Sequence, residues 1–463
     1  MATSKSGAGR AARSERPAYR CGECGWTASK WVGRCGECQA WGSVEEVGAA
    51  PAGVTRSRAV TMSARPIAEV EADAAAVWAT GVDELDRVLG GGIVSGSVVL
   101  LAGEPGVGKS TLLLDVASRA ASSARTVLYV TGEESAAQVR MRAERIGALR
   151  PRLLLAAETD LSTVLGHVDE VGPDLLIVDS VQTIASDAVD GSPGNVGQVR
   201  EVAASLIRAT KSRSMATVLV GHVTKDGGIA GPRVLEHLVD VVCQFEGDRQ
   251  SRLRLVRAVK NRYGPTDEVG CFDLSDTGIV GLADPSQLFL SRHAEPVAGT
   301  CVTVTLEGRR PLVGEVQALV APSALANPRR TTSGLDPSRV SMVLAVLERR
   351  CGVVLSGRDT YVATVGGVRL PEPANDLAAA LAVASAHSEV PLVPGTVAFG
   401  EVGLAGEVRP VPGVGRRLSE AARLGFRHAI IPTGTDDPAP DGMTVFEAGD
   451  LATALRRAMF RPL

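Results

Sequence analysis

Nine consecutive residues, GEPGVGKST, have the composition of a loop that binds nucleotide phosphates. They fit the pattern G-x-x-x-x-G-K-[ST], with the apolar run VVLLAG leading into them and TLLLDVASRA following. A strand, a glycine-rich loop and a helix in that order surround a phosphate with backbone N–H groups and the positive end of a helix dipole. The sequence therefore predicts a nucleotide site. Its predicted binding residues are Gly103, Glu104, Pro105, Gly106, Val107, Gly108, Lys109, Ser110 and Thr111.

Five side chains in or beside this loop could carry out phosphoryl chemistry. We expect Lys109 to reach the β- and γ-phosphates of ATP and Ser110 to ligate Mg2+. Asp179 ends the run LLIVDS and is expected to organise the same Mg2+, the alternative being a helix N-cap after the strand. Glu133 and Glu134 follow the run TVLYVTG, where the carboxyl end of a parallel strand would face the nucleotide. Glu133 is the first candidate for the base that activates water and Glu134 the second, unless the pair only complements a helix dipole.

His222 ends another apolar run, ATVLVGH, and Thr224 and Lys225 follow it. A polar group at that strand end could contact the γ-phosphate and report its loss. The alternative is a histidine whose hydrogen bonds are satisfied locally at the end of the strand.

Two C-x2-C pairs separated by ten residues predict a metal site near the N-terminus. Two such pairs place four thiolates around one Zn2+, and a site closed by four sulfurs is structural rather than catalytic. The predicted zinc ligands are Cys21, Cys24, Cys35 and Cys38. Trp31, Arg34 and Trp41 lie in or beside this cluster. We favour a role for them in the small core of the module, and stacking on nucleic-acid bases is the alternative.

The stretch KNRYG at 260–264 contains the last lysine of the chain. Only six of the 49 basic residues are lysines, so a lysine here is unusual for this sequence. The flanking runs 251–259 and 268–274 alternate as paired strands do, which predicts a hairpin with this stretch at its tip. Three roles remain open for Lys260 and Arg262: a solvated turn, a DNA contact, or a nucleotide contact across a subunit boundary. We favour the last because Lys109 already shows a lysine used against phosphate.

The elements that must position these residues belong to an α/β protein. Short β-branched runs alternate with segments of helical composition, which predicts a parallel sheet covered on both faces.

The net charge of −3 indicates no general attraction to nucleic acid, although residues 1–60 carry nine basic and five acidic groups. Because the chain has no apolar run of about 18 residues and no secretory signal, we expect a cytoplasmic protein without a membrane span. The predicted divisions are a disordered tail (1–18), a zinc module (19–45), a linker (46–77), an ATPase domain (78–285) and a C-terminal α/β domain (286–463).

The stretch TGVDELDRVLGGGIVSGSVVLLAGEPGVGKST resembles the entry into a RecA-type ATPase core. With the four-cysteine module before it and KNRYG after it, the chain from Tyr19 onward resembles the RadA (Sms) family of bacterial DNA repair proteins. The family signature is KNRFG, so Tyr263 is a mild departure that keeps the aromatic ring. The resemblance implies a DNA-dependent ATPase that acts on single-stranded and branched DNA beside the RecA recombinase. It also implies a homo-oligomeric ring, expected to be a hexamer, that promotes branch migration.

The C-terminal domain resembles the Lon protease domain, which needs a serine nucleophile and a lysine base. No serine lies in the matching stretch 371–380, and Ser385 and Ser388 come after it. Gly415 occupies the expected lysine position, and no lysine follows Lys260. Arginine cannot replace a lysine base because it does not deprotonate in proteins. We therefore expect a platform for ring assembly and DNA contact that is not a protease.

Six arginines of this domain are candidates for DNA contact, and the alternative for each is a solvated surface residue. They are Arg309, Arg310, Arg329, Arg330, Arg416 and Arg417. ATP is expected to bind between subunits, with cations from a neighbour's hairpin stabilising the transferred phosphoryl group. Single-stranded DNA would be held mainly by phosphate contacts, without strong sequence preference. Two rival functions are a RecA-core signalling protein that never binds DNA, and a peptidase, against which the missing lysine argues.

Overall fold

The structure is a computed structural model that describes most of the chain. The described residues are 19–46, 66–69, 76–222, 234–247, 252–291 and 295–459. They fall into two compact units, Met1–Glu71 and Ala72–Leu463. The expected tail at 1–18, most of the expected linker, and Thr224 and Lys225 lie outside the described residues.

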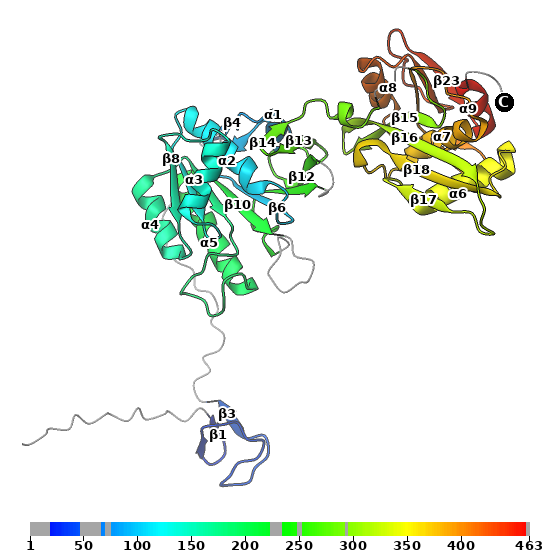
Figure 1. The fold of residues 1–463 in the computed structure, drawn as a ribbon. Coiled ribbons are helices and arrows are strands. Elements are labelled where there is room, and N and C mark those ends of the chain that lie inside the picture. Colours follow the sequence, from blue (N-terminus) through cyan, green and yellow to red (C-terminus); the bar gives the residue numbers. More distant parts are fainter. Residues whose placement is uncertain are drawn as a thin grey trace, which may run out of the picture. The chain divides into compact units, whose positions relative to one another are not determined.

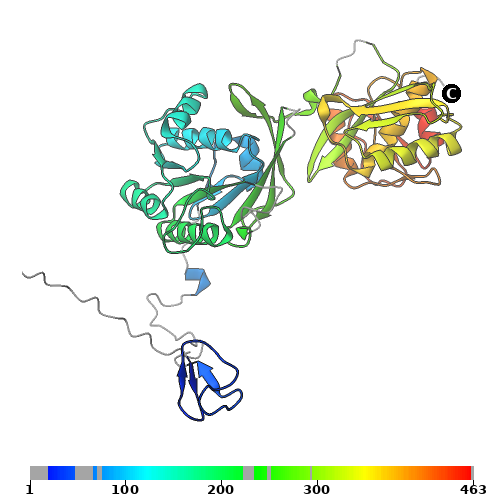
Figure 2. The same cartoon turned by 60° about the horizontal axis from the view of Figure 1, so that its bottom comes forward.

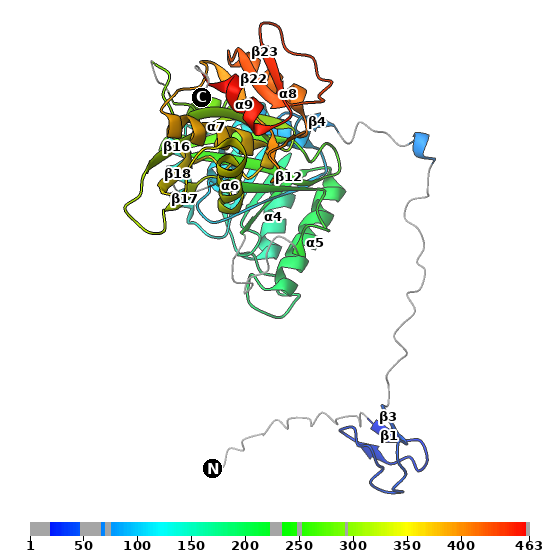
Figure 3. The ribbon, with the colours of Figure 1, turned by 90° about the vertical axis from the view of Figure 1, so that its right-hand side faces the viewer.

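The first unit contains a small antiparallel sheet in the order β2-β1-β3. Its strands are β1 (Tyr19–Cys21), β2 (Thr27–Ala28) and β3 (Val44–Glu46). β1 pairs with both neighbours, and its pairing with β3 is visible in Figure 3. The buried core contains Cys21, Cys35 and Val44, so two predicted metal ligands also form the interior of the module.

The second unit contains a nine-stranded sheet in which six adjacent strands are parallel, as the sequence predicts (Figure 1). In order across the sheet the strands are β14 (Gly278–Gly281), β13 (Val269–Ser275), β12 (Leu253–Asn261), β11 (Val241–Gly247), β6 (Val98–Gly103), β10 (Ala216–His222), β9 (Leu175–Asp179), β7 (Val127–Thr131) and β8 (Leu153–Ala157). The helices are α1 (Asp83–Leu89), α2 (Lys109–Ser122), α3 (Ala136–Arg145), α4 (Leu161–Val171) and α5 (Val196–Arg213).

The central strands appear in the sequence as continuous apolar runs because their side chains are buried on both faces of the sheet. In β6, Val99 and Leu101 pack with α1, α2 and α3, whereas Val98 and Leu100 pack with α4 and α5. Figure 2 shows helices on both faces of the sheet. Successive strand residues face opposite sides, so a strand buried on both faces needs apolar residues at every position.

The predicted hairpin is β12 and β13, which pair antiparallel from Leu253 with Asp273 to Arg257 with Val269. β12 also pairs with β11, and β11 runs parallel to β6. The hairpin therefore extends the ATPase sheet, as expected from its alternating sequence.

A second, seven-stranded sheet forms the C-terminal part in the order β17-β18-β16-β15-β19-β22-β23. Its strands are β15 (Thr300–Glu307), β16 (Arg310–Pro322), β17 (Arg330–Ser333), β18 (Arg358–Thr364), β19 (Thr396–Ala398), β22 (His428–Pro432) and β23 (Thr444–Ala448). Its helices are α6 (Pro337–Cys351), α7 (Asp376–Ser388), α8 (Val414–Arg423) and α9 (Leu451–Ala458). α7 is apolar around most of its circumference, and it packs on β15 and β16 and beside α6 and α9. Among the described helices, none is both long enough and apolar enough to span a bilayer.

Candidate functional site

Glycines shape the predicted phosphate loop where β6 gives way to α2. A Cβ added to Gly103 would lie 2.4 Å from the carbonyl oxygen of Phe245 in the neighbouring strand β11. Gly108 has φ of +110° immediately before the helix, a backbone conformation that favours glycine. Arg254 of β12 donates to the carbonyl of Val107 at 3.2 Å. The loop is therefore fixed from the β11–β12 side, and its exposed part consists of Glu104, Pro105 and Gly106.

Lys109 is buried at the start of α2 and makes three polar contacts. Its Nζ donates to the carbonyls of Gly103 and Glu104, both at 2.9 Å, and lies 3.2 Å from His222 Nδ1. Burial lowers the pKa of Lys109 to about 8, while Asp179 and Glu133 oppose that shift. The ammonium is thus held in the loop, in a setting where phosphate would restore its preference for the charged form.

Glu133 belongs to the same hydrogen-bonded group, and Glu134 does not. Oε1 of Glu133 lies 2.8 Å from His222 Nε2 and accepts from Ser180 Oγ at 2.6 Å. The hydrogen bonds from His222 and Ser180 lower the pKa of Glu133 to about 2, against the effect of its partial burial. Glu134 instead pairs with Arg142 of α3 at 2.5 Å. The structure therefore brings the first of the two candidate bases, and not the second, into this group with Lys109.

Asp179 is buried at the end of β9, where Oδ2 accepts from the Tyr129 hydroxyl at 2.7 Å. Burial and the Asp179 carboxylate raise the pKa of Tyr129 well above its ordinary value, so the phenol stays protonated and donates. No described helix begins at Asp179, since the next one is α5 with Asn195 as its N-cap. The N-cap alternative for Asp179 is therefore wrong. The Asp179 carboxylate and the hydroxyl of Ser110 are hard oxygen donors of the kind that Mg2+ prefers.

Sequence reasoning did not identify Tyr129 or Ser180, although both support the predicted carboxylates. Ser180 directly follows Asp179 at the carboxyl end of β9, so its position was a usable signal. Tyr129 lies within a run read only as a buried strand, and nothing local in the sequence marks its hydroxyl as functional.

The four predicted zinc ligands converge in the first unit. Their sulfur atoms all lie within 4.8 Å of one another, with Cys21 and Cys38 at 3.7 Å and Cys24 and Cys35 at 3.5 Å. Four thiolates at about 2.3 Å from a tetrahedral Zn2+ would lie roughly 3.8 Å apart, so the arrangement fits the metal.

The prediction that Trp31 and Trp41 belong to the core of the zinc module is wrong. Trp31 and Trp41 are 65% and 77% exposed. A Cβ at Gly33 would lie 3.6 Å from the Trp31 ring and 3.9 Å from the Trp41 ring, so both rings border this glycine. The guanidinium of Arg34 lies 5.6 Å from the centre of the Trp41 ring. Cys21, Cys35 and Val44 form the small interior and Trp26 packs against it, whereas Trp31 and Trp41 lie outside it.

Known proteins match the chain along most of its length. Residues 19–46 match a family model described as a rubredoxin metal binding domain, residues 64–228 an AAA domain, and residues 367–435 subunit ChlI of Mg-chelatase. The DNA repair protein RadA of Mycobacterium tuberculosis is 56% identical over 446 residues, covering 95% of this chain and 93% of the relative. The chain belongs to the RadA family of DNA repair proteins. The RadA proteins of Mycolicibacterium smegmatis (54% identity, 95% of this chain and 96% of the relative) and Streptococcus pyogenes (46%, 90% and 93%) agree.

Among solved structures, a KaiC-like protein from Pyrococcus horikoshii aligns with 45% of this RadA-family chain and 99% of its own. Its TM-score is 0.38 and its identity 20%, so it adds nothing to the family assignment. Membership in the RadA family agrees with the RecA-like core and the four-cysteine ribbon seen in the structure.

The RadA-family pentad KNRYG does not lie beside the phosphate loop of its own chain. Val241 pairs with Asn261 on one side and with Val99 on the other, whereas Phe245 pairs with Gly103. The pentad is therefore at the amino end of β6, about 13 Å along the strands from the loop at the carboxyl end.

Within the chain, the pentad's two cations hold the segment that enters β11. Lys260 Nζ donates to the carbonyls of Glu236 and Val239, at 2.9 and 2.8 Å. Arg262 pairs with Asp240 at 2.9 Å, and its side chain remains 56% exposed. Arg262 is thus the more accessible of the two cations.

Two of the six predicted DNA-contacting arginines are buried, so the prediction is wrong for them. Arg310 is 8% exposed, pairs with Glu84 of α1 and donates to the carbonyls of Leu282 and Ala283. Arg417 is fully buried and pairs with Glu372. A buried arginine persists only where every donor finds a partner, which is how both are used here. The other four predicted arginines are exposed: Arg309, Arg329, Arg330 and Arg416.

The buried pair of Arg417 and Glu372 joins α8, which contains Gly415, to the stretch 371–380 in which a Lon-type nucleophile would be expected. Arg417 donates to the carbonyl of Pro412 at 3.0 Å, and its partner Glu372 accepts from Thr305 at 3.0 Å. Asn375 accepts from Thr303 at 3.0 Å just before α7. Ser385 is buried and accepts from the backbone N–H of Gly299 at 2.9 Å, so it is a structural residue and not an exposed nucleophile.

Proposed function

We propose that this RadA-family protein is a DNA-dependent ATPase that processes recombination intermediates and promotes branch migration beside the RecA recombinase. The observation that carries the ATPase part is the chain of contacts Lys109–His222–Glu133. Through His222, these contacts link Lys109, which would hold the γ-phosphate, to Glu133, which would act on the attacking water. Single-stranded and branched DNA would be the ligands that stimulate turnover.

ATP would bind with its phosphates in the loop, Lys109 against the β- and γ-phosphates and Ser110 and Asp179 on Mg2+. Mg2+ would neutralise charge that develops on the phosphates. A γ-phosphate competes with His222 for the ammonium of Lys109, and His222 is then released to adjust its contact with Glu133. Because the pKa of Glu133 is about 2, this carboxylate is a weak proton acceptor and acts mainly by orienting the attacking water. Orientation suffices for a loose phosphoryl-transfer transition state.

Neighbouring copies would complete each site in a homo-oligomeric ring, proposed to be a hexamer. The position of KNRYG at the amino end of the sheet excludes a contact with the loop of the same chain, and leaves it available to the next subunit. Arg262 is the better candidate for that contact because its side chain is more than half exposed. Lys260 would position it, since its ammonium already serves two carbonyl groups.

DNA would contact two sets of exposed groups. The four exposed arginines of the Lon-like domain would bind phosphates, which gives affinity without sequence preference. Trp31 and Trp41 form an exposed aromatic surface with Arg34 beside it, an arrangement suited to stacking on unpaired bases. The zinc site would hold the loop that presents these rings, and the Lon-like domain would not cleave peptides.

Matched variants of Lys260 and Arg262 test the ring mechanism. Arg262→Ala should keep the fold and ATP binding but lose DNA-stimulated turnover and branch migration, because its partner Asp240 retains Lys211 at 2.7 Å. Lys260→Ala should also unfold more easily, by about 2 kcal/mol, since two carbonyls lose a charged donor. Arg252→Ala, which removes an exposed arginine immediately before β12 and at the other end of that strand from KNRYG, is the control and should behave as the wild type. Full DNA-stimulated activity in Arg262→Ala would contradict the proposal.

A further inference from the structure

Helix α5, which covers one face of the ATPase sheet (Figure 1), turns a row of basic side chains away from that sheet. The side of the helix that packs against β6, β9 and β10 is apolar and contains Val199, Val202, Ala203 and Leu206. On the opposite side, Arg200, Arg208 and Lys211 lie within about 80° of one another around the helix axis. All three side chains are exposed.

Small residues occupy the rest of this outward face. Gly197 and Ala204 lie at the same angle as the three cations, so the face between the cations carries no large side chain. From Arg200 to Lys211 the row extends for about 16 Å along the helix. An extended polyanion could therefore approach the helix backbone closely and contact the three cations one after another.

The charge of α5 differs from that of its surroundings. The helix contains four basic residues and one acidic residue, in a chain whose net charge is −3. The acidic residue, Glu201, lies beside the row and pairs with Arg208 at 3.2 Å. The neighbouring helix α4 contains two acids, Asp169 and Glu170, and no lysine or arginine. A phosphate backbone would thus be attracted to α5 and not to α4.

Lys211, at one end of the row, is held by a buried carboxylate that also holds Arg262. Its Nζ lies 2.7 Å from Oδ2 of Asp240, and Arg262 lies 2.9 Å from Oδ1 of the same residue. The side chain of Asp240 is 4% exposed and that of Lys211 is 48% exposed, so the ammonium is positioned but remains accessible. A phosphate bound at Lys211 would compete with Asp240 for this ammonium.

We propose that this face of α5 binds the phosphates of single-stranded DNA through Arg200, Arg208 and Lys211, in addition to the exposed groups named above. The inference rests on the proposed function, because it names where the stimulating DNA binds. A row of cations along an open surface binds the DNA backbone with little sequence preference. Through Asp240, DNA on this face would also act on Arg262, the cation proposed to reach the neighbouring nucleotide site.

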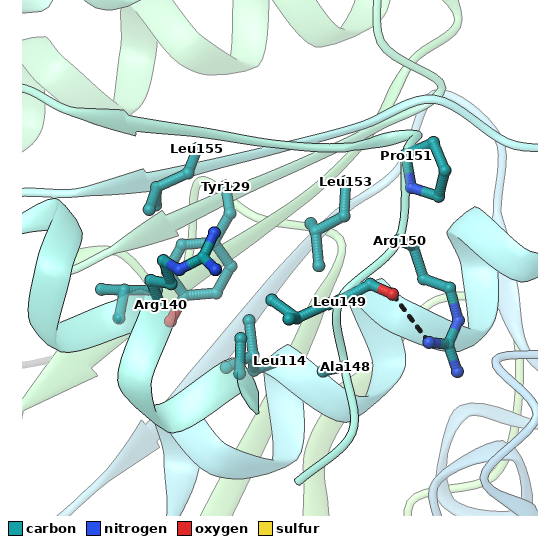
Figure 4. Close-up of a pocket in the computed structure, with 11 residues that line it drawn as sticks. Leu114, Tyr129, Arg140, Ala148, Leu149, Arg150, Pro151, Leu153 and Leu155 are labelled. Carbon is teal, nitrogen blue, oxygen red and sulfur yellow. Dashed lines mark hydrogen bonds between the residues drawn. The ribbon is translucent and has the colours of Figure 1, made fainter. Parts of the chain in front are cut away.

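The opposite face of the sheet offers a matched control. There α3 also carries exposed arginines, Arg140 and Arg145, but Arg140 borders an open apolar pocket of about 490 Å³ between α2, α3 and β8 (Figure 4). Leu149 and Leu155 of this pocket are 45% and 37% exposed. Apolar groups thus occupy the surface next to these arginines, where α5 has small residues, and this surface suits a hydrated phosphate backbone less well.

Anisotropy titrations of the full-length protein with a labelled single-stranded oligonucleotide of mixed sequence, at several salt concentrations, test the proposal. Arg200→Gln combined with Arg208→Gln should weaken binding by at least about tenfold. The slope of log affinity against log salt should become shallower by about 1.4, the value for two lost phosphate contacts. Arg140→Gln combined with Arg145→Gln removes the same charge and should bind as the wild type does. Arg200→Lys combined with Arg208→Lys should retain most of the affinity, because the charge is kept.

Each other result counts against the inference. If the glutamine variant of α5 keeps the wild-type affinity and salt slope, the inference fails, and DNA-stimulated hydrolysis by the wild type would still support the proposed function. An equal loss in the α3 variant also overturns the inference, since net charge alone would then explain the effect. Weaker self-association with unchanged DNA affinity would assign the face to an acidic surface of a second copy. A wild type that binds no single-stranded DNA at any salt concentration contradicts both proposals.

Photo-crosslinking tests the same face without removing a cation, and so does not depend on how well the variants fold. With p-benzoylphenylalanine in place of Ala204, in the middle of the row, irradiation should attach the full-length protein to the single-stranded oligonucleotide. The same group in place of Met141, which is 71% exposed on α3, should give little product. Equal crosslinking at the two positions, or none at Ala204, would overturn the proposal.

Discussion

His222 Nδ1 lies 3.2 Å from the ammonium of Lys109, at the point where strand β10 ends beside the phosphate loop. The other ring nitrogen lies 2.8 Å from Glu133. Since the ammonium of Lys109 can only donate, Nδ1 accepts in this contact, which leaves the ring N–H of a neutral imidazole on Nε2. This imidazole therefore connects the proposed γ-phosphate contact to the proposed water-orienting group.

Removing the His222 side chain should uncouple phosphate binding from turnover. His222→Ala is expected to bind ATP within a few-fold of the wild type, because Lys109 keeps its carbonyl contacts. Its kcat should fall by about 10²–10³, the usual effect of losing one positioned catalytic contact. His167→Ala removes a half-exposed histidine 3.7 Å from Glu158 and serves as the control. An unchanged kcat in His222→Ala would show that the histidine has only a local structural role.

The pKa of Lys109 predicts a pH dependence of ATP binding. Its value of about 8 in the free protein rises when anionic phosphates arrive, so ATP binding takes up a proton above about pH 8. ATP affinity should then decrease as pH increases from about 8 towards 10.5. Calorimetric titration in buffers of different ionisation enthalpy measures the proton uptake. Lys109→Met should abolish it, and proton release in the wild type would contradict the assignment.

The lowered pKa of Lys109 also predicts how its contribution to the free energy of unfolding changes with pH. Between about pH 8 and 10.5 the unfolded chain holds more protons on Lys109 than the folded chain does. The contribution of Lys109 to the free energy of unfolding therefore increases with pH across that window.

Substitution of the adjacent residues Arg416 and Arg417 should have different effects, on DNA binding for Arg416 and on stability for Arg417. Arg416→Ala removes an exposed cation and should weaken single-stranded DNA binding and its salt dependence, with the melting temperature unchanged. Arg417→Ala leaves Glu372 without its buried partner and should cost about 3–5 kcal/mol of unfolding free energy. Chemical denaturation and fluorescence-anisotropy titrations on both variants measure these effects. Equal stability loss in the two would contradict the structure at this helix.

The exposed tryptophans predict a base-stacking contribution. Trp31→Ala with Trp41→Ala should lower affinity for single-stranded DNA by at least about tenfold, since each stacked base contributes about 1–3 kcal/mol. Zinc content should stay at one per chain because neither ring contacts the sulfurs of the core. Replacement by phenylalanine should restore most of the affinity. Loss of zinc in the double variant would instead indicate that the rings support the fold.

Local patterns in the sequence were sufficient for the strands, the hairpin, the phosphate loop and the cysteine cluster. Each depends on neighbours along the chain: apolar runs for β6, β7, β9 and β10, glycine spacing for the loop, and paired cysteines for the metal. The convergence of Lys109, Glu133 and Asp179 also followed, because carboxyl ends of parallel strands meet at one edge of a sheet.

Contacts between distant segments could not be predicted in the same way. Arg416 and Arg417 are adjacent and share the same sequence surroundings. Only the packing of α8 decides that Arg416 is exposed and that Arg417 is buried and pairs with Glu372. The partners of Lys260, the carbonyls of Glu236 and Val239, depend on the register between β11 and β12. The exposure of Trp31 and Trp41 depends on how the module folds, since Trp26, and neither of these two, packs against its core.

The most direct test of the central claim is an ATPase titration of the wild-type protein with single-stranded DNA at several salt concentrations. The account predicts that DNA increases kcat, that half-saturation needs more DNA as salt rises, and that Lys109→Ala has no activity at any DNA concentration. A wild-type ATPase rate that is the same with and without DNA at every salt concentration would contradict it, and would favour a RecA-core protein that uses ATP without acting on DNA.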